Sequence, residues 1–128
     1  MHIPARVLIV DDHPAARRTA RAVLNDLGMN VAVVCGEAED GKRAIEKVRR
    51  LEPDIVVLDI GMPKMDGVQA AYEIRRIAPY AKIIFFTIND SPEAVTAAKL
   101  LGVEALVSKS SPARVLVSTI QKIVTAKS

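Results

Sequence analysis

The stretch Ile55-Val56-Val57-Leu58-Asp59 decides the fold, because four consecutive apolar residues run directly into a carboxylate. A strand that is apolar at every position is typical of a parallel sheet covered by helices on both faces. A strand with one solvated face would instead alternate between apolar and polar residues. The stretch therefore predicts a central, fully buried strand that ends in a chemically reactive side chain.

Three further apolar runs end in the same way, each in polar residues of a different chemical kind. They are Val7-Leu8-Ile9-Val10 before Asp11 and Asp12, Ile83-Ile84-Phe85-Phe86 before Thr87, and Ala105-Leu106-Val107 before Ser108 and Lys109. If all four runs are parallel strands, right-handed crossovers bring their carboxyl ends to one edge of the sheet. Open α/β sheets bind their ligands at that edge. The pattern thus predicts a site rich in carboxylates, with a hydroxyl and an ammonium group beside them.

Segments with helical spacing of apolar residues separate the runs. Helices are expected over residues 14–27, 41–51, about 66–77, about 92–101 and from about 113 to about 126, and one more strand over 31–35, followed by an acidic connection over 36–40. Five strand-then-helix units with short connections predict an α/β, doubly wound, five-stranded parallel sheet with five helices. At 128 residues the whole chain fits one domain.

Composition excludes several classes of function. The sequence has no apolar run of membrane-spanning length and no signal-peptide pattern, so we expect a cytoplasmic protein without a membrane partner. Cys35 is the only cysteine, so redox or metal chemistry at this residue is disfavoured. The net charge of +3 comes from dispersed basic residues, and only 3% of residues are aromatic, which argues against direct binding of nucleic acid.

The predicted cluster of polar side chains suits phosphoryl transfer with a divalent cation. Asp11, Asp12 and Asp59 offer the oxygen ligands that Mg²⁺ prefers. Asp59 could then attack a phosphoryl donor, while Thr87 and Lys109 bind the transferred oxygens. Each residue also has a structural alternative: the Asp pair could cap a helix, Asp59 could be a turn residue, and Thr87 and Lys109 could be simple strand ends. Their joint occurrence at four strand ends favours the functional interpretation.

From about residue 6 to about 126, the chain resembles the receiver domain of bacterial two-component response regulators. The matching motifs are Val7-Leu8-Ile9-Val10-Asp11-Asp12-His13-Pro14, Asp54-Ile55-Val56-Val57-Leu58-Asp59-Ile60-Gly61-Met62-Pro63 with Met65-Asp66-Gly67, Phe86-Thr87, and Ser108-Lys109. The resemblance implies a flavodoxin-like receiver fold with strand order 2-1-3-4-5 across residues 1–128.

The resemblance also implies a role for each site residue. Asp59 looks like the phosphoacceptor, and Asp11 and Asp12, with Asp59 and the backbone carbonyl of Gly61, like the ligands of Mg²⁺ or Mn²⁺. Thr87 resembles the switch hydroxyl and Lys109 the lysine that pairs with the phosphate. A sensor histidine kinase would be the phosphodonor. The protein would act as a switch and not as an enzyme on external substrates.

Three positions depart from the family pattern. Leu106 stands where many receivers carry an aromatic residue, which puts signalling by an aromatic rotamer in doubt. Ile88 replaces a small residue after the switch threonine, and we expect it to cover the pocket and slow the chemistry at Asp59. Ser110 replaces a common proline after the lysine, so a cis peptide bond there is disfavoured.

The output is expected at the face formed by the fourth helix, the fifth strand and the fifth helix. The fourth helix carries more apolar residues than one buried stripe needs, so this face could form a homodimer, or the extra residues could simply widen the core contact. The motifs around Asp11 and Lys109 resemble receivers fused to helix-turn-helix domains, so DNA would be reached only through an output domain absent from this sequence. A phosphorylation-independent interaction module is the alternative. A phosphatase is disfavoured, because Gly61 stands where a general acid would be needed.

Overall fold

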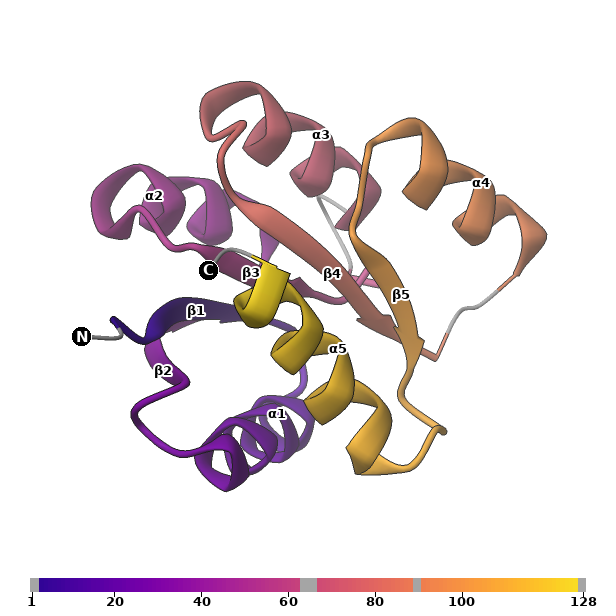
Figure 1. Cartoon of the computed structure of the whole chain (residues 1–128). Helices are drawn as coiled ribbons and strands as arrows, with labels where there is room; N and C mark the ends of the chain where they lie inside the picture. The colour runs from indigo at the N-terminus through magenta and orange to yellow at the C-terminus, as the bar shows by residue number, and fades with distance from the viewer. Residues whose placement is uncertain (1–2, 63–66, 89–90, 127–128) are drawn as a thin grey trace.

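The computed structural model describes residues 3–62, 67–88 and 91–126. Strands and helices alternate along the chain, as Figure 1 shows. The elements are β1 (Ala5–Val10), α1 (Pro14–Leu27), β2 (Ala32–Ala38), α2 (Gly41–Leu51), β3 (Ile55–Leu58), α3 (Gly67–Ile77), β4 (Lys82–Thr87), α4 (Pro92–Leu100), β5 (Ala105–Ser108) and α5 (Ala113–Ala126).

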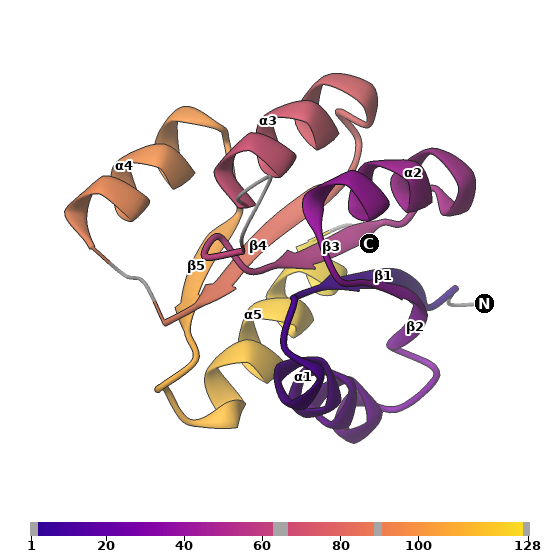
Figure 2. The ribbon, with the colours of Figure 1, turned by 180° about the vertical axis from the view of Figure 1, so that it is seen from behind.

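The five strands form one parallel sheet in the order β2-β1-β3-β4-β5. Helices α2, α3 and α4 cover one face of the sheet, and α1 and α5 cover the other (Figures 1 and 2). The predicted doubly wound α/β fold and its strand order are therefore confirmed. β3 lies in the middle of the sheet, as its uninterrupted apolar run predicts.

The core consists of two mainly aliphatic layers, one on each side of the sheet, and each contains one phenylalanine. Alternate residues of β3 enter different layers: Val56 and Leu58 pack with α2, α3 and α4, and Ile55 and Val57 pack with α1 and α5. Each of these four side chains is at most 2% exposed. Burial of one such side chain typically contributes about 1.5–3 kcal/mol to folding. The two layers hold the carboxyl end of β3 rigidly in place.

Local signals in the sequence set the starts of three helices. Pro14 is the first residue of α1, where its missing N–H costs nothing. The Asp40 carboxylate accepts a hydrogen bond from the Arg43 N–H at 2.8 Å and so caps α2. The Ser91 hydroxyl accepts one from the Ala94 N–H at 3.2 Å and caps α4 in the same way.

The second strand differs from its prediction. β2 runs from Ala32 to Ala38, so residues 36–38, which were expected in a connection, continue the strand. The pairing with β1 skips Cys35: Val7 lies opposite Val34, and Leu8 lies opposite Gly36. A bulge leaves one residue of a strand unpaired while the pairing continues on both sides of it. Pairing with β1 therefore keeps residues 36–38 in the strand, although their composition predicted a connection. The expected start of the third helix at Asp66 lies outside the described residues, and α3 is observed from Gly67 onward.

Candidate functional site

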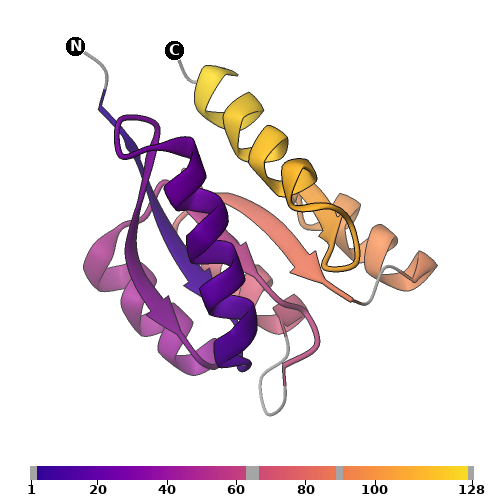
Figure 3. The same cartoon turned by 90° about the horizontal axis from the view of Figure 1, so that it is seen from below.

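The parallel strands end at one edge of the sheet (Figure 3), and the polar residues predicted to meet stand at or directly after these strand ends. Asp11 and Asp59 directly follow β1 and β3, and the backbone ladder continues through both. The Asp11 N–H donates to the Ala38 carbonyl at 3.0 Å, and the Asp59 N–H donates to the Val10 carbonyl at 3.0 Å. The strand ends thus fix the positions of the two carboxylates before any ligand binds.

Thr87 and Lys109 complete the edge. Thr87 is the last residue of β4 and is fully buried. The Lys109 N–H donates to the Thr87 carbonyl at 2.9 Å, so the residue after β5 stays in register with the end of β4. Leu58 lies opposite Phe85 in the β3–β4 ladder, which places Asp59 and Thr87 one and two residues further toward the edge.

Three carboxylates form the centre of the site. One ligand atom from each of Asp11, Asp12, His13 and Asp59 lies within 4.8 Å of all the others. Asp11 is 2% exposed and Asp59 is 5% exposed, so water screens their charges poorly. Like charges this close repel each other unless a cation compensates them.

Lys109 supplies part of that compensation. Its Nζ lies 2.6 Å from Asp11 Oδ2 and 3.2 Å from Asp59 Oδ2, so the ammonium bridges the two carboxylates. Burial by itself lowers the pKa of Lys109, but the hydrogen bonds and charges of Asp11 and Asp59 outweigh it, and the net pKa is raised. Lys109 is therefore fully protonated at neutral pH. Its contribution to stability is complete below its ordinary pKa of 10.5 and is lost only as the pH rises through the raised value.

Among the described residues, one buried carboxylate oxygen of the cluster has no hydrogen-bond donor. The Asp11 Oδ1 atom accepts from the His13 N–H at 2.9 Å, and Asp59 Oδ1 accepts from the Gly61 N–H at 3.0 Å. Asp12 Oδ1 is buried, and no described residue donates a hydrogen bond to it. The His13 ring nitrogen Nδ1 lies 3.0 Å from this oxygen, but without the orientation of a hydrogen bond. A buried carboxylate oxygen without a donor suits a metal ligand.

Sequence reasoning missed two groups around the cluster. His13 was quoted only as part of a motif, yet its ring lies beside both Asp11 and Asp12. Arg17 is one of the dispersed basic residues and was not predicted at the site, yet its Nη1 donates to the Asp11 carbonyl at 2.7 Å and its Nε to Glu37 at 3.0 Å. The position of Arg17 six residues after Asp11, on the helix that follows it, is compatible with this contact but does not reveal it.

The three departures from the family pattern have different outcomes. Ile88 is 78% exposed, so the prediction that it covers the pocket is wrong. An apolar side chain next to a buried threonine can point outward at a strand end, and here it does. Leu106 is half-buried and packs against the core layer under α2, α3 and α4. The peptide bond between Lys109 and Ser110 is trans, as the serine predicts.

Replacing Ile88 by Ala is therefore expected to change the rate of Asp59 labelling by acetyl phosphate and Mg²⁺ by less than about twofold. A side chain that is 78% exposed makes too few contacts to gate a neighbouring site. Time-resolved intact-mass measurement of the two proteins provides the comparison. An increase of fivefold or more in the variant would restore steric gating as the explanation.

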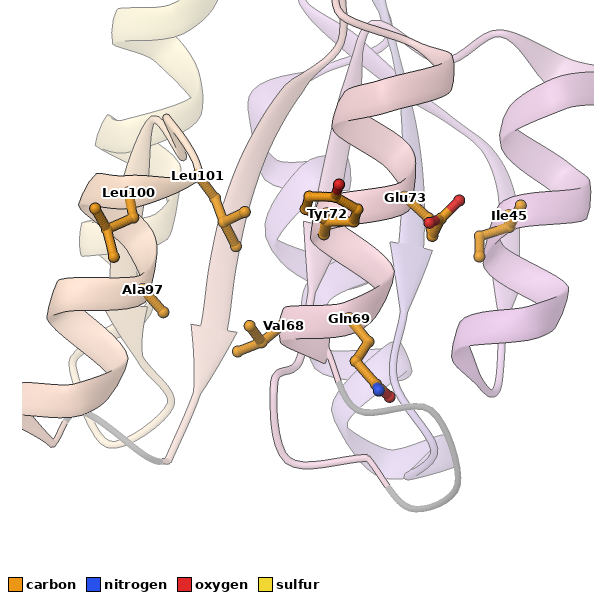
Figure 4. A pocket seen from close by; sticks show the side chains of 8 residues that line it. All are labelled: Ile45, Val68, Gln69, Tyr72, Glu73, Ala97, Leu100 and Leu101. Carbon is orange, nitrogen blue, oxygen red and sulfur yellow. The ribbon is translucent and has the colours of Figure 1, made fainter.

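A separate apolar groove lies among the helices on one side of the sheet (Figure 4). It has a volume of about 660 Å³, and its side chains come from α2, α3, α4 and the residue that follows α4. The lining residues are Ile45, Val68, Gln69, Tyr72, Glu73, Ala97, Leu100 and Leu101. None of them belongs to the carboxylate cluster, so the groove is distinct from the candidate site.

Among the described residues, no helix has the length and apolar character needed to cross a membrane.

The chain is similar to proteins of one known family. Residues 7–121 match the response regulator receiver domain family. The chain is 39% identical to chemotaxis protein CheY of Thermotoga maritima over 87% of its own length and 91% of that protein. It is 37% identical to the nitrate/nitrite response regulator protein NarP of Escherichia coli over 92% of its own length, and spans only 54% of that protein.

A solved structure supports the same assignment. The crystal structure of a LuxR-family two-component response regulator from Aurantimonas sp. SI85-9A1 superimposes with a TM-score of 0.86 and 34% identity. The match covers 96% of this chain and 86% of that one. The fold of the chain agrees with that of this structure. This chain therefore belongs to the response regulator receiver domain family.

Proposed function

We propose that this protein is a phosphorylation-dependent signalling switch in which Asp59 accepts a phosphoryl group from a sensor histidine kinase. The observation that carries the proposal is the meeting of Asp11, Asp12, Asp59 and Lys109 at the strand ends, with Lys109 Nζ 2.6 and 3.2 Å from two of the carboxylates. Residues 1–128 would act as one receiver domain with a core over about 6–126, and the family match over 7–121 supports this extent. The cytoplasmic location expected from the sequence remains part of the proposal.

The donor set fits a hard divalent cation such as Mg²⁺ or Mn²⁺. Asp11, Asp12 and Asp59 would hold it, together with the Gly61 carbonyl, and the buried Asp12 oxygen without a hydrogen-bond donor is the observation that supports this fit. A bound cation supplies charge neutralisation for the carboxylates and for the transferred phosphoryl oxygens. Receiver domains bind Mg²⁺ at such an acidic cluster.

Asp59, Lys109 and Thr87 each have a separate role in the transfer of the phosphoryl group. A carboxylate oxygen of Asp59 attacks phosphorus, the new O–P bond forms an acyl phosphate, and the P–N bond of the donor phosphohistidine breaks with its electron pair left on the nitrogen. The Lys109 ammonium, already within 3.2 Å of Asp59, pairs with one phosphoryl oxygen. The Thr87 hydroxyl donates to another and so reports the phosphorylated state to β4 and the segment that follows it.

Replacing Lys109 by Ala is expected to slow phosphorylation of Asp59 by about a hundredfold at saturating Mg²⁺, because a buried donor to the transferred oxygens is lost. Lys99→Ala is the matched control, since Lys99 is exposed in the last turn of α4. The rate is measured by intact mass with acetyl phosphate. Equal rates for the two variants would contradict the role of Lys109.

The proposed output surface comprises α4, β5 and α5, and its two helices differ in exposure. Val95 of α4 is 38% exposed, as expected for an apolar contact surface, whereas Leu100 lines the groove beside α3. In contrast, Leu116 and Ile120 of α5 are buried in the core. A homodimer through this face would therefore depend mainly on α4, and DNA would be reached only through an output domain outside this sequence.

The dimer proposal predicts that beryllofluoride with Mg²⁺ doubles the solution mass measured by light scattering. Val95→Ser should return the mass to that of a monomer, because it removes an exposed apolar side chain from the side of α4 that faces away from the groove. Met29→Ser is the control, since Met29 is 79% exposed in the connection between α1 and β2, outside the proposed surface. A beryllofluoride complex that stays monomeric would refute the dimer while leaving the phosphorylation proposal intact.

A phosphorylation-independent interaction module is the competing function. The site favours phosphorylation, because Lys109 is held between Asp11 and Asp59 rather than turned to solvent. Hydrolysis of external phosphoesters is not expected, since Gly61 occupies the position two residues after Asp59 and offers no acid. Receiver domains are generally signalling modules without an enzymatic activity of their own.

A further inference from the structure

The guanidinium of Arg17 links the backbone of the acidic pair to the edge strand of the sheet. Arg17 lies in the first turns of α1, and its side chain is 19% exposed. Its Nη1 donates to the Asp11 carbonyl at 2.7 Å, and its Nε donates to Glu37 Oε1 at 3.0 Å. A planar guanidinium with donors in a fixed fork holds two acceptors in a defined relation, which a flexible ammonium cannot do as well.

The Asp11 carbonyl oxygen, which accepts the hydrogen bond from Arg17, influences the orientation of Asp12. The Asp11 carbonyl and the Asp12 nitrogen belong to one planar peptide unit, so a bond to the carbonyl oxygen fixes the rotation of the whole unit. That rotation sets the direction in which the Asp12 side chain leaves the backbone. Asp11 itself has further restraints, because its N–H donates to the Ala38 carbonyl and its carboxylate pairs with Lys109. Asp12 Oδ1 has no hydrogen-bond donor among the described residues and only the His13 ring, 68% exposed, beside it at 3.0 Å, so the backbone contributes strongly to its position.

Glu37 in turn holds the guanidinium in place. Its Oε1 accepts from Arg17, and its Oε2 accepts from Arg21 Nε at 2.9 Å. The backbone of Glu37 is paired with Ile9 of β1, and its carbonyl accepts a hydrogen bond from Lys47 of α2. The backbone of Glu37 is thus held by both β1 and α2, so its carboxylate offers Arg17 a hydrogen-bond acceptor at a fixed position.

We propose that Arg17 is a positioning residue for the divalent cation: held by Glu37, it fixes the Asp11–Asp12 peptide so that the Asp12 carboxylate faces the site. This inference rests on the proposed function. It assigns to Arg17 a role that acts through Asp12 and involves no contact with the cation or the phosphoryl group. Support of this kind for a metal ligand is typically worth ten- to a hundredfold in metal affinity.

The test measures cation binding in the unphosphorylated protein, by electron paramagnetic resonance of free Mn²⁺ and competition with Mg²⁺. Arg17→Ala is expected to raise the dissociation constant about tenfold. Arg21→Ala is the matched control, because Arg21 lies one turn further along α1 and binds the same Glu37 carboxylate but bonds to no atom of Asp11. Its dissociation constant should stay within about twofold of wild type.

A second readout separates positioning from general damage. At saturating Mg²⁺ the labelling rate of Arg17→Ala with acetyl phosphate should return to within about twofold of wild type, because only the affinity has changed. If Arg17→Ala does not fold in the presence of a chelator, Arg17→Lys replaces it, with an expected rise of at least about threefold in the dissociation constant because one ammonium serves both acceptors poorly.

Each outcome points to one conclusion. A tenfold loss of affinity in the Arg17 variant alone, repaired by saturating Mg²⁺, supports the positioning role. Equal affinities in the Arg17 and Arg21 variants, or a rate that excess Mg²⁺ does not restore, overturn it. A wild-type protein that binds neither Mn²⁺ nor Mg²⁺ refutes the proposed cation site itself, which distinguishes the two failures.

Discussion

Asp12→Asn is expected to weaken Mg²⁺ binding by about a hundredfold and to leave the metal-free protein at least as stable as wild type. The two effects have one cause. Asp12 adds a third negative charge to a cluster whose atoms lie within 4.8 Å, and Oδ1 of Asp12 is buried without a hydrogen-bond donor. Removing the charge relieves repulsion in the metal-free protein and removes a ligand from the bound one.

Isothermal titration with Mg²⁺ and urea unfolding in a chelator measure the two effects separately. Asp26→Asn is the matched control, since it makes the same chemical change at an exposed position of α1. The control should alter the Mg²⁺ affinity by less than about twofold. An Asp12→Asn protein that binds Mg²⁺ normally, or that loses more than about 1 kcal/mol of unfolding free energy in chelator, would contradict this account of the cluster.

Gly67→Ala is expected to destabilise the protein by about 3 kcal/mol or more. A Cβ atom at Gly67 would lie 2.3 Å from the Asp59 carbonyl oxygen and 2.3 Å from Ile60 Cα, both of which are backbone atoms that no side-chain rotation can move. The first residue of α3 therefore has to be glycine for the helix to start directly over the segment that carries the phosphoacceptor. Separation of the two segments would also displace Asp59.

Gly61→Ala is the control for this substitution. Its Cβ would lie 3.6 Å from Asp59 Oδ1, an ordinary contact, so the expected loss is below about 1 kcal/mol. Urea unfolding monitored by circular dichroism compares the two variants. A Gly67→Ala protein as stable as Gly61→Ala would mean that α3 can move away from Asp59 at little cost.

The parts of the fold that could be predicted are those in which local pattern and tertiary environment agree. Ile55 to Leu58 are apolar at every position, and a strand buried on both faces needs that pattern. The edge strand β2 was predicted too short, because Gly36 and Glu37 have poor β-propensity and their place in the strand comes from pairing with β1.

In the site, too, some features could be predicted from the sequence and others depend on tertiary contacts. The edge at which Asp11, Asp59 and Lys109 meet follows from parallel strands and could be predicted. The direction in which a side chain points at a strand end could not, and Ile88 turns outward although a covering position was expected. The contact of Arg17 with the Asp11 carbonyl was also beyond sequence reasoning, because it depends on the angle at which α1 leaves β1.

The most direct test of the central claim is the intact mass of the protein after incubation with acetyl phosphate and Mg²⁺, for wild type and Asp59→Asn. We expect the mass of the wild type to rise by one phosphoryl group. The mass of the variant, and that of the wild type when Mg²⁺ is chelated, should not change. Labelling of Asp59→Asn to the wild-type level, or no labelling of the folded wild type, would contradict the assignment of Asp59 as the phosphoacceptor.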